Sequence, residues 1–114
     1  MMKVALSSSG KDINSNLSEV FGRCPYFLIA EIENKEIKGI EVVENISRSQ
    51  AGGVGIAVAQ MIVEKGASVV ITGNVGPRAL DVLKQFKVDI FNGSGSVEEN
   101  LQKFIDGKLK KLPS

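Results

Sequence analysis

The residues best suited to chemistry in this sequence are one cysteine and three arginines. Cys24 lies between Arg23 and Pro25, and a neighbouring guanidinium favours the thiolate, which is the form that binds soft metals. One thiolate cannot hold a metal ion alone, so Cys24 is a candidate metal ligand only as part of a larger set. The competing interpretation is that Cys24 is half-buried and packs as a small hydrophobe.

Glycine-rich turns form the second group of candidates. The 12 glycines among 114 residues exceed the usual share of about 7%, and most fall in the segments 7–10, 52–55, 73–76 and 93–95. Glycine lets backbone N–H groups approach a ligand closely, and a helix N-terminus adds partial positive charge, so these segments suit an anion. Arg48 and Arg78 are near enough in sequence to supply full charges.

The candidate ligand-binding residues are therefore mostly small or basic. They are Ser8, Arg23, Cys24, Arg48, Gly52, Gly53, Gly73, Asn74, Gly76, Arg78 and Gly93. The competing interpretation is that the glycines only satisfy turn geometry and that the arginines are solvated surface residues.

Several enzyme classes are excluded by what the sequence lacks. It contains no histidine, which rules out a Ser-His-Asp or Cys-His hydrolase and a histidine-ligated zinc site. An enzyme that uses Cys24 as a nucleophile lacks a histidine to activate it. The segment Gly53-Val54-Gly55 matches part of a dinucleotide fingerprint without its third glycine, and no P-loop motif occurs. We therefore expect a binding protein and no catalytic residues.

Bulk properties favour one small intracellular domain. A length of 114 residues suits a single core, with residues 1–107 as the domain and 108–114 as a free tail. The net charge of +1 gives no general attraction to nucleic acid or to an anionic membrane. No apolar run is long enough for a membrane span or a signal peptide, so a cytoplasmic location is expected.

The elements that must position these residues follow from hydrophobic spacing. A buried strand at 3–7 is followed by a loop and by a short helical turn at 17–21. A hairpin pairs 26–33 with 36–44 through Asn34-Lys35. Three helices follow, and between them the β-branched and apolar runs at 68–72 and 88–91 predict two strands. The helices begin near Gly53, at Pro77 and at Ser96, and the last ends at Gly107.

This order of elements predicts a five-stranded mixed α/β sheet with helices on both faces. Right-handed crossovers give the strand order 3-2-1-4-5, with strand 2 antiparallel. The loops at 7–10, 73–76 and 93–95 then follow parallel strands and meet at one carboxyl edge, where open α/β sheets bind ligands.

The sequence resembles the dinitrogenase iron-molybdenum cofactor biosynthesis family over nearly its whole length. The matching segments are Leu17-Ser18-Glu19-Val20-Phe21-Gly22-Arg23-Cys24-Pro25-Tyr26-Phe27, Glu44-Asn45, Gly52-Gly53-Val54-Gly55, Gly73-Asn74-Val75-Gly76-Pro77-Arg78-Ala79 and Gly107-Lys108-Leu109. The resemblance implies a ribonuclease H-like fold without nuclease activity. It also implies that members, including the molybdenum-copper orange proteins, carry preformed metal-sulfur clusters between donor and acceptor proteins.

One departure from the family pattern concerns the site. Several relatives have histidine just before the double glycine, where this chain has Arg48-Ser49-Gln50-Ala51. The leading hypothesis is a carrier or scaffold for an iron-sulfur or molybdenum-sulfur cluster, held by Cys24 and by electrostatics. The alternative is a regulatory or interaction domain that binds a phosphorylated small molecule or a protein partner. Either would be a monomer or a weak dimer.

Overall fold

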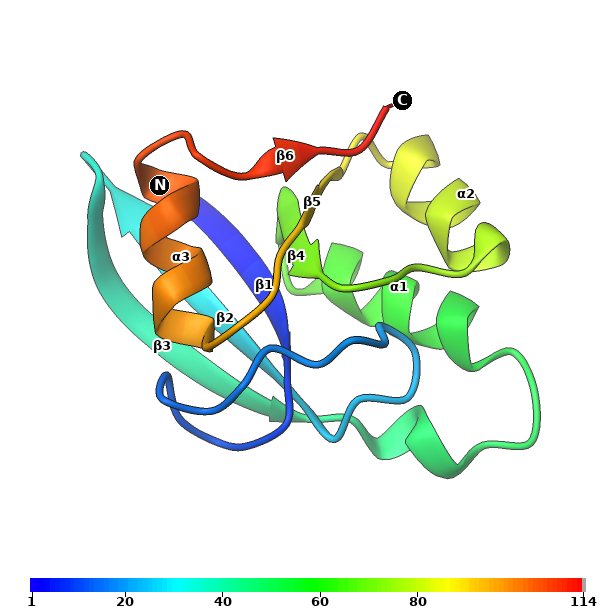
Figure 1. Cartoon of the computed structure of the whole chain (residues 1–114). Coiled ribbons are helices and arrows are strands. Elements are labelled where there is room, and N and C mark those ends of the chain that lie inside the picture. Colours follow the sequence, from blue (N-terminus) through cyan, green and yellow to red (C-terminus); the bar gives the residue numbers. More distant parts are fainter. Residues whose placement is uncertain (114) are drawn as a thin grey trace.

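The computed structural model describes residues 1–113, which form a six-stranded mixed sheet with helices on both faces (Figure 1). The strands are β1 (Met2–Ser8), β2 (Tyr26–Glu33), β3 (Glu36–Glu44), β4 (Val69–Thr72), β5 (Asp89–Asn92) and β6 (Lys110–Lys111). The helices are α1 (Val54–Glu64), α2 (Pro77–Gln85) and α3 (Val97–Ile105), with a 3₁₀ turn η1 (Ile46–Ser49) before α1. Within this range no helix has the length and apolar character needed to cross a membrane.

The strand order is β3-β2-β1-β4-β5-β6. β1 lies at the centre, antiparallel to β2 and parallel to β4, so that Ala5 is opposite both Ile29 and Val70. The predicted order of the first five strands and the antiparallel direction of strand 2 are therefore confirmed. The ribonuclease H-like assignment stays a prediction.

The sixth strand corrects the prediction of five strands and, at 110–112, that of a free tail, whereas Ser114 of the predicted tail lies outside the described residues. β6 pairs antiparallel with β5, with Lys111 opposite Phe91, and the N–H of Leu112 donates to the carbonyl of Ile90 at 2.8 Å. Two lysines carry no strand pattern. The pairing follows from the open edge of β5 and from Leu112, whose side chain packs against the core, and neither feature is visible in the local sequence.

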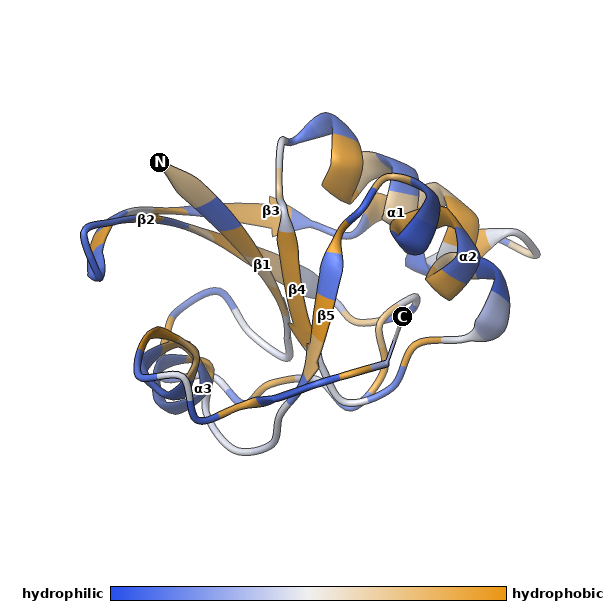
Figure 2. Ribbon diagram, turned by 90° about the horizontal axis from the view of Figure 1, so that it is seen from above, coloured by the Kyte–Doolittle hydropathy of each residue, from blue (hydrophilic) through white to orange (hydrophobic). Residues whose placement is uncertain are grey.

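Two hydrophobic layers hold the helices to the sheet. On β1, Ala5 faces α1 and α2, whereas Val4 and Leu6 face α3. Figure 2 shows α3 on one side of the sheet and α1 and α2 on the other. Because both faces of the central strands are covered, these strands read as continuous apolar runs.

The ends of several elements were predicted from local chemistry. Asn34 and Lys35 have φ of 53° and 65°, as a two-residue hairpin turn requires. Pro77 is the first residue of α2, and the Ser96 hydroxyl accepts the N–H of Glu99 at the start of α3. Phe86 follows the last residue of α2. It is 55% exposed, because it lies at the C-terminal cap of α2, beyond the helix's buried stripe.

The helical turn expected at 17–21 is absent. This segment instead crosses the carboxyl ends of the central strands β1 and β4. Leu17 forms a bridge with Ser8, and Val20 forms one with Asn74. The N–H of Phe21 donates to the carbonyl of Asn74 at 3.1 Å. Peptide groups at the ends of β1 and β4 thus replace the local bonds of a helical turn, an example of tertiary contacts overriding local preference.

Candidate anion-binding pocket

The main cavity is about 540 Å³ in volume and lies where three backbone segments meet. Its walls are the loop after β1 (residues 20–23), the start of α1 (53–56) and the start of α2 (74 and 76–79). The bridge between Val20 and Asn74, at the carboxyl ends of the central strands, brings the first and third segments together. The cavity volume falls within the range usual for small-molecule sites, about 300–1,000 Å³.

Two helix N-termini open into this cavity. α1 begins after Gly53, whose φ is +70°, and α2 begins at Pro77. Over the described chain, neither helix has a side chain that caps its first N–H groups, and neither has an acidic residue in its first turn. The first N–H groups and the positive end of each helix dipole are therefore free of intramolecular neutralisation.

Small residues allow the two helix starts to meet. A Cβ placed on Gly55 would lie 3.2 Å from the Cβ of Ala79, and one placed on Gly22 would lie 3.5 Å from the Cα of Gly55. The floor of the cavity is therefore mostly backbone. Gly22 and Gly55 lie in segments that the sequence singled out, but the candidate list missed them because contacts between distant segments leave no local pattern.

The charges in the lining all have one sign. Arg23 and Arg78 are exposed at the cavity, and no aspartate or glutamate occurs among the described residues that line it. Arg23 is tethered, because its Nη1 donates to the carbonyl of Arg48 at 2.6 Å. The side chains of Val20 and Ile56 add apolar surface. The cavity is thus suited to an anion with a weakly hydrated surface.

Asn45 holds the backbone on both sides of Arg23. Its side chain is buried, with 3% of its surface exposed. The Nδ2 group donates to the carbonyls of Gly22 at 2.9 Å and Cys24 at 2.8 Å, and Oδ1 accepts the N–H of Ser47 at 3.2 Å. The candidate list did not include Asn45. The available signal was its place directly after the second hairpin strand, inside a segment that carried the family resemblance.

The structure brings some of the predicted site residues together and separates others. Those that line the cavity are Arg23, Gly53, Asn74, Gly76 and Arg78. Gly52 is exposed next to Gly53. Arg48 lies in η1 and reaches the site only through its carbonyl, which accepts from Arg23.

Three predicted residues serve packing outside the cavity. Ser8 is fully buried, and its hydroxyl donates to the carbonyl of Gly10 at 2.7 Å. A Cβ on Gly73 would lie 2.6 Å from the Cα of Glu19, and one on Gly93 would collide with the side chain of Asn100. These two glycines permit close contact between distant segments, a role that neither the ligand-binding nor the turn-geometry interpretation named.

Comparison with known proteins gives the family. The family model described as dinitrogenase iron-molybdenum cofactor matches residues 2–107. The chain belongs to this dinitrogenase iron-molybdenum cofactor family. The uncharacterized protein MJ0580 of Methanocaldococcus jannaschii, a relative, is 41% identical over 113 residues, which cover 98% of this chain and 92% of that protein.

Solved structures similar to this family member share its fold over the whole chain. The apo form of the orange protein from Desulfovibrio gigas has a TM-score of 0.91 and 26% identity, covering 100% of this chain and 95% of that one. The Thermotoga protein TM1290 has a TM-score of 0.85 and 37% identity, covering 100% and 96%.

Cys24 is more deeply buried than the sequence predicted. Its side chain is fully buried, and Sγ donates to the carbonyls of Phe21 at 3.4 Å and Tyr26 at 3.3 Å. Burial raises the pKa of the thiol to about 12, and this exceeds the opposing effects of its hydrogen bonds and of the Arg48 charge. A guanidinium therefore acts on Cys24 in the expected direction, but the charge is that of Arg48, and burial outweighs it. The geometry supports the small-hydrophobe interpretation, and no cluster of three potential metal ligands occurs within residues 1–113.

Proposed function

We propose that the chain is a non-enzymatic carrier or scaffold for a preformed metal-sulfur cluster, bound as a polyanion in the cavity between α1 and α2. One observation carries the proposal: two uncapped helix N-termini and two arginines line a cavity, and no carboxylate occurs among the described residues of that lining. Fixed N–H dipoles and arginines are the groups that stabilise multivalent anions in proteins.

The donor set favours a complete cluster over a bare metal ion. No cysteine or histidine belongs to the described lining, so the protein offers no soft ligand to complete a coordination sphere. A cluster that already has its sulfide ligands needs only hydrogen bonds and opposite charge. The candidate ligand-binding groups are therefore Arg23 and Arg78 together with the N–H groups at the starts of α1 and α2, and Cys24 is not required.

The comparisons support this proposal at the level of the family. The family model is named for the iron-molybdenum cofactor, and the fold of the orange protein's apo form is closely similar. The resemblance described for the sequence implies that such proteins pass clusters between donor and acceptor proteins, and we extend that role to this chain.

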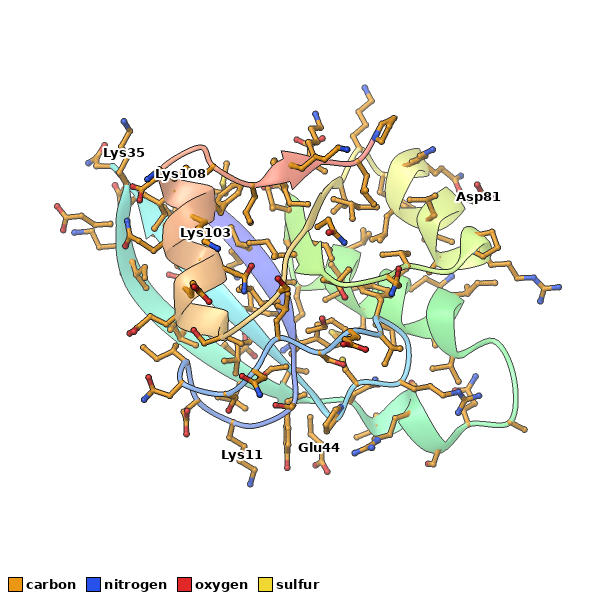
Figure 3. The ribbon with its side chains drawn as sticks, in the orientation of Figure 1. Lys11, Lys35, Glu44, Asp81, Lys103 and Lys108 are labelled. Carbon is orange, nitrogen blue, oxygen red and sulfur yellow. The ribbon has the colours of Figure 1, made fainter. Side chains whose placement is uncertain are left out.

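The proposal is tested by anaerobic titration of the purified protein with tetrathiomolybdate, followed by its charge-transfer absorption and by native mass spectrometry. The protein should take up the anion, and the double variant Arg23→Gln/Arg78→Gln should lose most of this uptake. A matched control, Lys103→Gln/Lys108→Gln, removes the same charge from α3 and the segment after it (Figure 3) and should bind like the unmodified protein. Equal loss in both variants, or no uptake at all, contradicts the proposal.

A second function is favoured by the same helix N-termini, because they also bind phosphate groups. The cavity would then hold a phosphorylated small molecule, and the chain would be a regulatory domain. Thermal unfolding with nucleotides and with inorganic phosphate distinguishes the two functions. At a ligand concentration a hundredfold above Kd, binding adds about 2.7 kcal/mol to the free energy of unfolding, so stabilisation by phosphates without uptake of thiomolybdate would favour this alternative.

A further inference from the structure

The outer edge of the sheet carries an uncovered apolar face. β3 is an edge strand of nine residues, and Figure 1 shows it along the side of the molecule away from α2. Ile37, Ile40 and Val42 are 40%, 38% and 45% exposed. Their partners on β2, which are Ile32, Ala30 and Leu28, are buried in the layer under α3. The apolar face thus continues past the area that α3 covers.

A β-bulge aligns the three exposed side chains. Ile32 is opposite Ile37 and Glu31 is opposite Gly39, so Lys38 is the extra residue of the bulge. Because two residues of β3 take the place of one, Ile37 lies on the same face as Ile40 and Val42 in spite of the odd spacing. Ile40 is therefore flanked on each side, one position away on this face, by an exposed aliphatic residue.

We propose that β3 pairs antiparallel with β3 of a second copy of this chain, about a twofold axis at Ile40. In this register Ile40 is opposite Ile40 of the partner subunit, and Ile37 is opposite Val42 of the partner subunit. All the apolar contacts then lie on the α3 side of a continuous sheet. The pairing satisfies the free N–H and C=O groups of both edges, and a twofold interface buries the same patch on each copy.

Charge complementarity favours this register. Lys38 and Glu41 already form ion pairs within the chain, with Glu36 and Lys65 respectively, and each gains a second partner of opposite sign. The bulge at Lys38 and Gly39 is opposite Glu41 of the partner subunit, and the axis repeats this contact. Glu44 is the last residue of β3, and Lys35 lies in the turn directly before its first residue (Figure 3), so in this register each approaches the other residue type across the interface. A register centred on Val42 would instead place Ile40 opposite Glu44 of the partner subunit, an apolar side chain against a carboxylate.

Bulges and charged residues usually protect an edge strand from pairing. Here each bulge falls opposite an ordinary residue, and Lys38, Glu41 and Glu44 each face the opposite sign, so these features oppose other partners and other registers while permitting this one. The contact is one strand wide and falls in the range below about 1,200 Å² that is typical of weak complexes. We therefore expect a dimer whose population rises with concentration. No residue of β3 lines the cavity, so dimerisation and ligand binding can be tested separately.

The test uses a reciprocal charge exchange, read out by sedimentation velocity on the full chain over micromolar to millimolar concentrations. Lys38→Glu alone and Glu41→Lys alone each place like charges opposite one another and should weaken dimerisation on the order of tenfold. A mixture of these two variants places unlike charges at both contacts and should form a heterodimer. The double variant Lys38→Glu/Glu41→Lys should restore the homodimer.

Further variants separate the interface from the fold. Ile40→Glu places two carboxylates on the axis and should abolish dimerisation, whereas Phe86→Glu changes a more exposed apolar residue beyond α2 and should leave it unchanged. Circular dichroism checks that each variant is folded, as expected for substitutions at exposed sites. A wild-type chain that stays monomeric at millimolar concentration overturns the proposal. Dimerisation that survives both single charge changes also overturns it, since the copies would then meet elsewhere.

Discussion

Gly55 and Ala79 pack against each other where the first turns of α1 and α2 meet. A Cβ on Gly55 would lie only 3.2 Å from the Cβ of Ala79, so no larger residue fits at Gly55 without a shift. The two helices approach the same cavity from different points of the chain, and this contact sets how far apart their N-termini are. The geometry of the candidate site thus depends on a residue that carries no functional group.

A larger side chain at Gly55 should separate the helix starts. We expect Gly55→Val to lower the free energy of unfolding by about 1–3 kcal/mol, as overpacking does, and to weaken anion uptake. Urea denaturation measures the first effect and thiomolybdate titration the second. Gln60→Val, at an exposed position of the same helix, should stay within about 0.5 kcal/mol of the wild type. Equal effects of both changes would show that the Gly55 contact is unimportant.

Removal of the Asn45 side chain should leave one buried and one partly buried carbonyl without their donor. Asn45→Ala removes the bonds to Gly22 and Cys24, and each unsatisfied buried group costs about 1–3 kcal/mol. We expect a loss of about 2 kcal/mol or more in urea denaturation. Asn14→Ala changes an exposed asparagine and serves as the control. If the two variants were equally stable, Asn45 would not position the loop that carries Arg23.

Stability should fall at alkaline pH because of Cys24. Its pKa is about 12 in the folded chain against an ordinary value of 9.0. Between these values the unfolded chain loses the thiol proton while the folded chain keeps it, so the free energy of unfolding decreases as pH rises, by about 1.4 kcal/mol per pH unit for this group.

The measurement for Cys24 is the free energy of unfolding at neutral and at alkaline pH, for the wild type and for Cys24→Ala. The alanine variant loses packing at every pH, but its stability should fall less steeply above the ordinary thiol pKa. A thiol reagent should modify the folded wild type very slowly at neutral pH. Parallel pH profiles together with fast modification would contradict the buried state of the thiol.

The sixth strand can be tested at Leu112. Leu112→Pro removes the N–H that donates to the carbonyl of Ile90 as well as the packing of the side chain, whereas Leu112→Ala removes only the packing. The proline variant should therefore be less stable than the alanine variant by about 1 kcal/mol in thermal or urea unfolding. Two equally stable variants would mean that β6 adds nothing through its backbone.

Local chemistry made much of the fold predictable. Pro77 and Ser96 predict helix starts because a proline at the first helical position and a serine cap act only on residues within the same turn. The order of the first five strands follows from handedness rules. The site was harder to predict. Arg23, Asn74 and Arg78 were selected by residue type, yet only the bridge between 20 and 74 shows that their segments share one cavity.

The errors have a common physical origin in contacts between distant segments. The spacing of Leu17 and Phe21 suits a helical turn, but bonds to β1 and β4 determine the structure there. Cys24 is adjacent to an arginine in sequence, whereas in space it lies in the core, where desolvation outweighs charge. In both cases the deciding partner is remote in the chain.

The cavity lining holds arginines as its only titratable side chains among the residues described. A bound anion is therefore held by hydrogen bonds and by opposite charge, with no thiolate or imidazole in that lining to bond to a metal. Departure of a bound anion must depend on the anion itself, on competing ions, or on another macromolecule that takes it over.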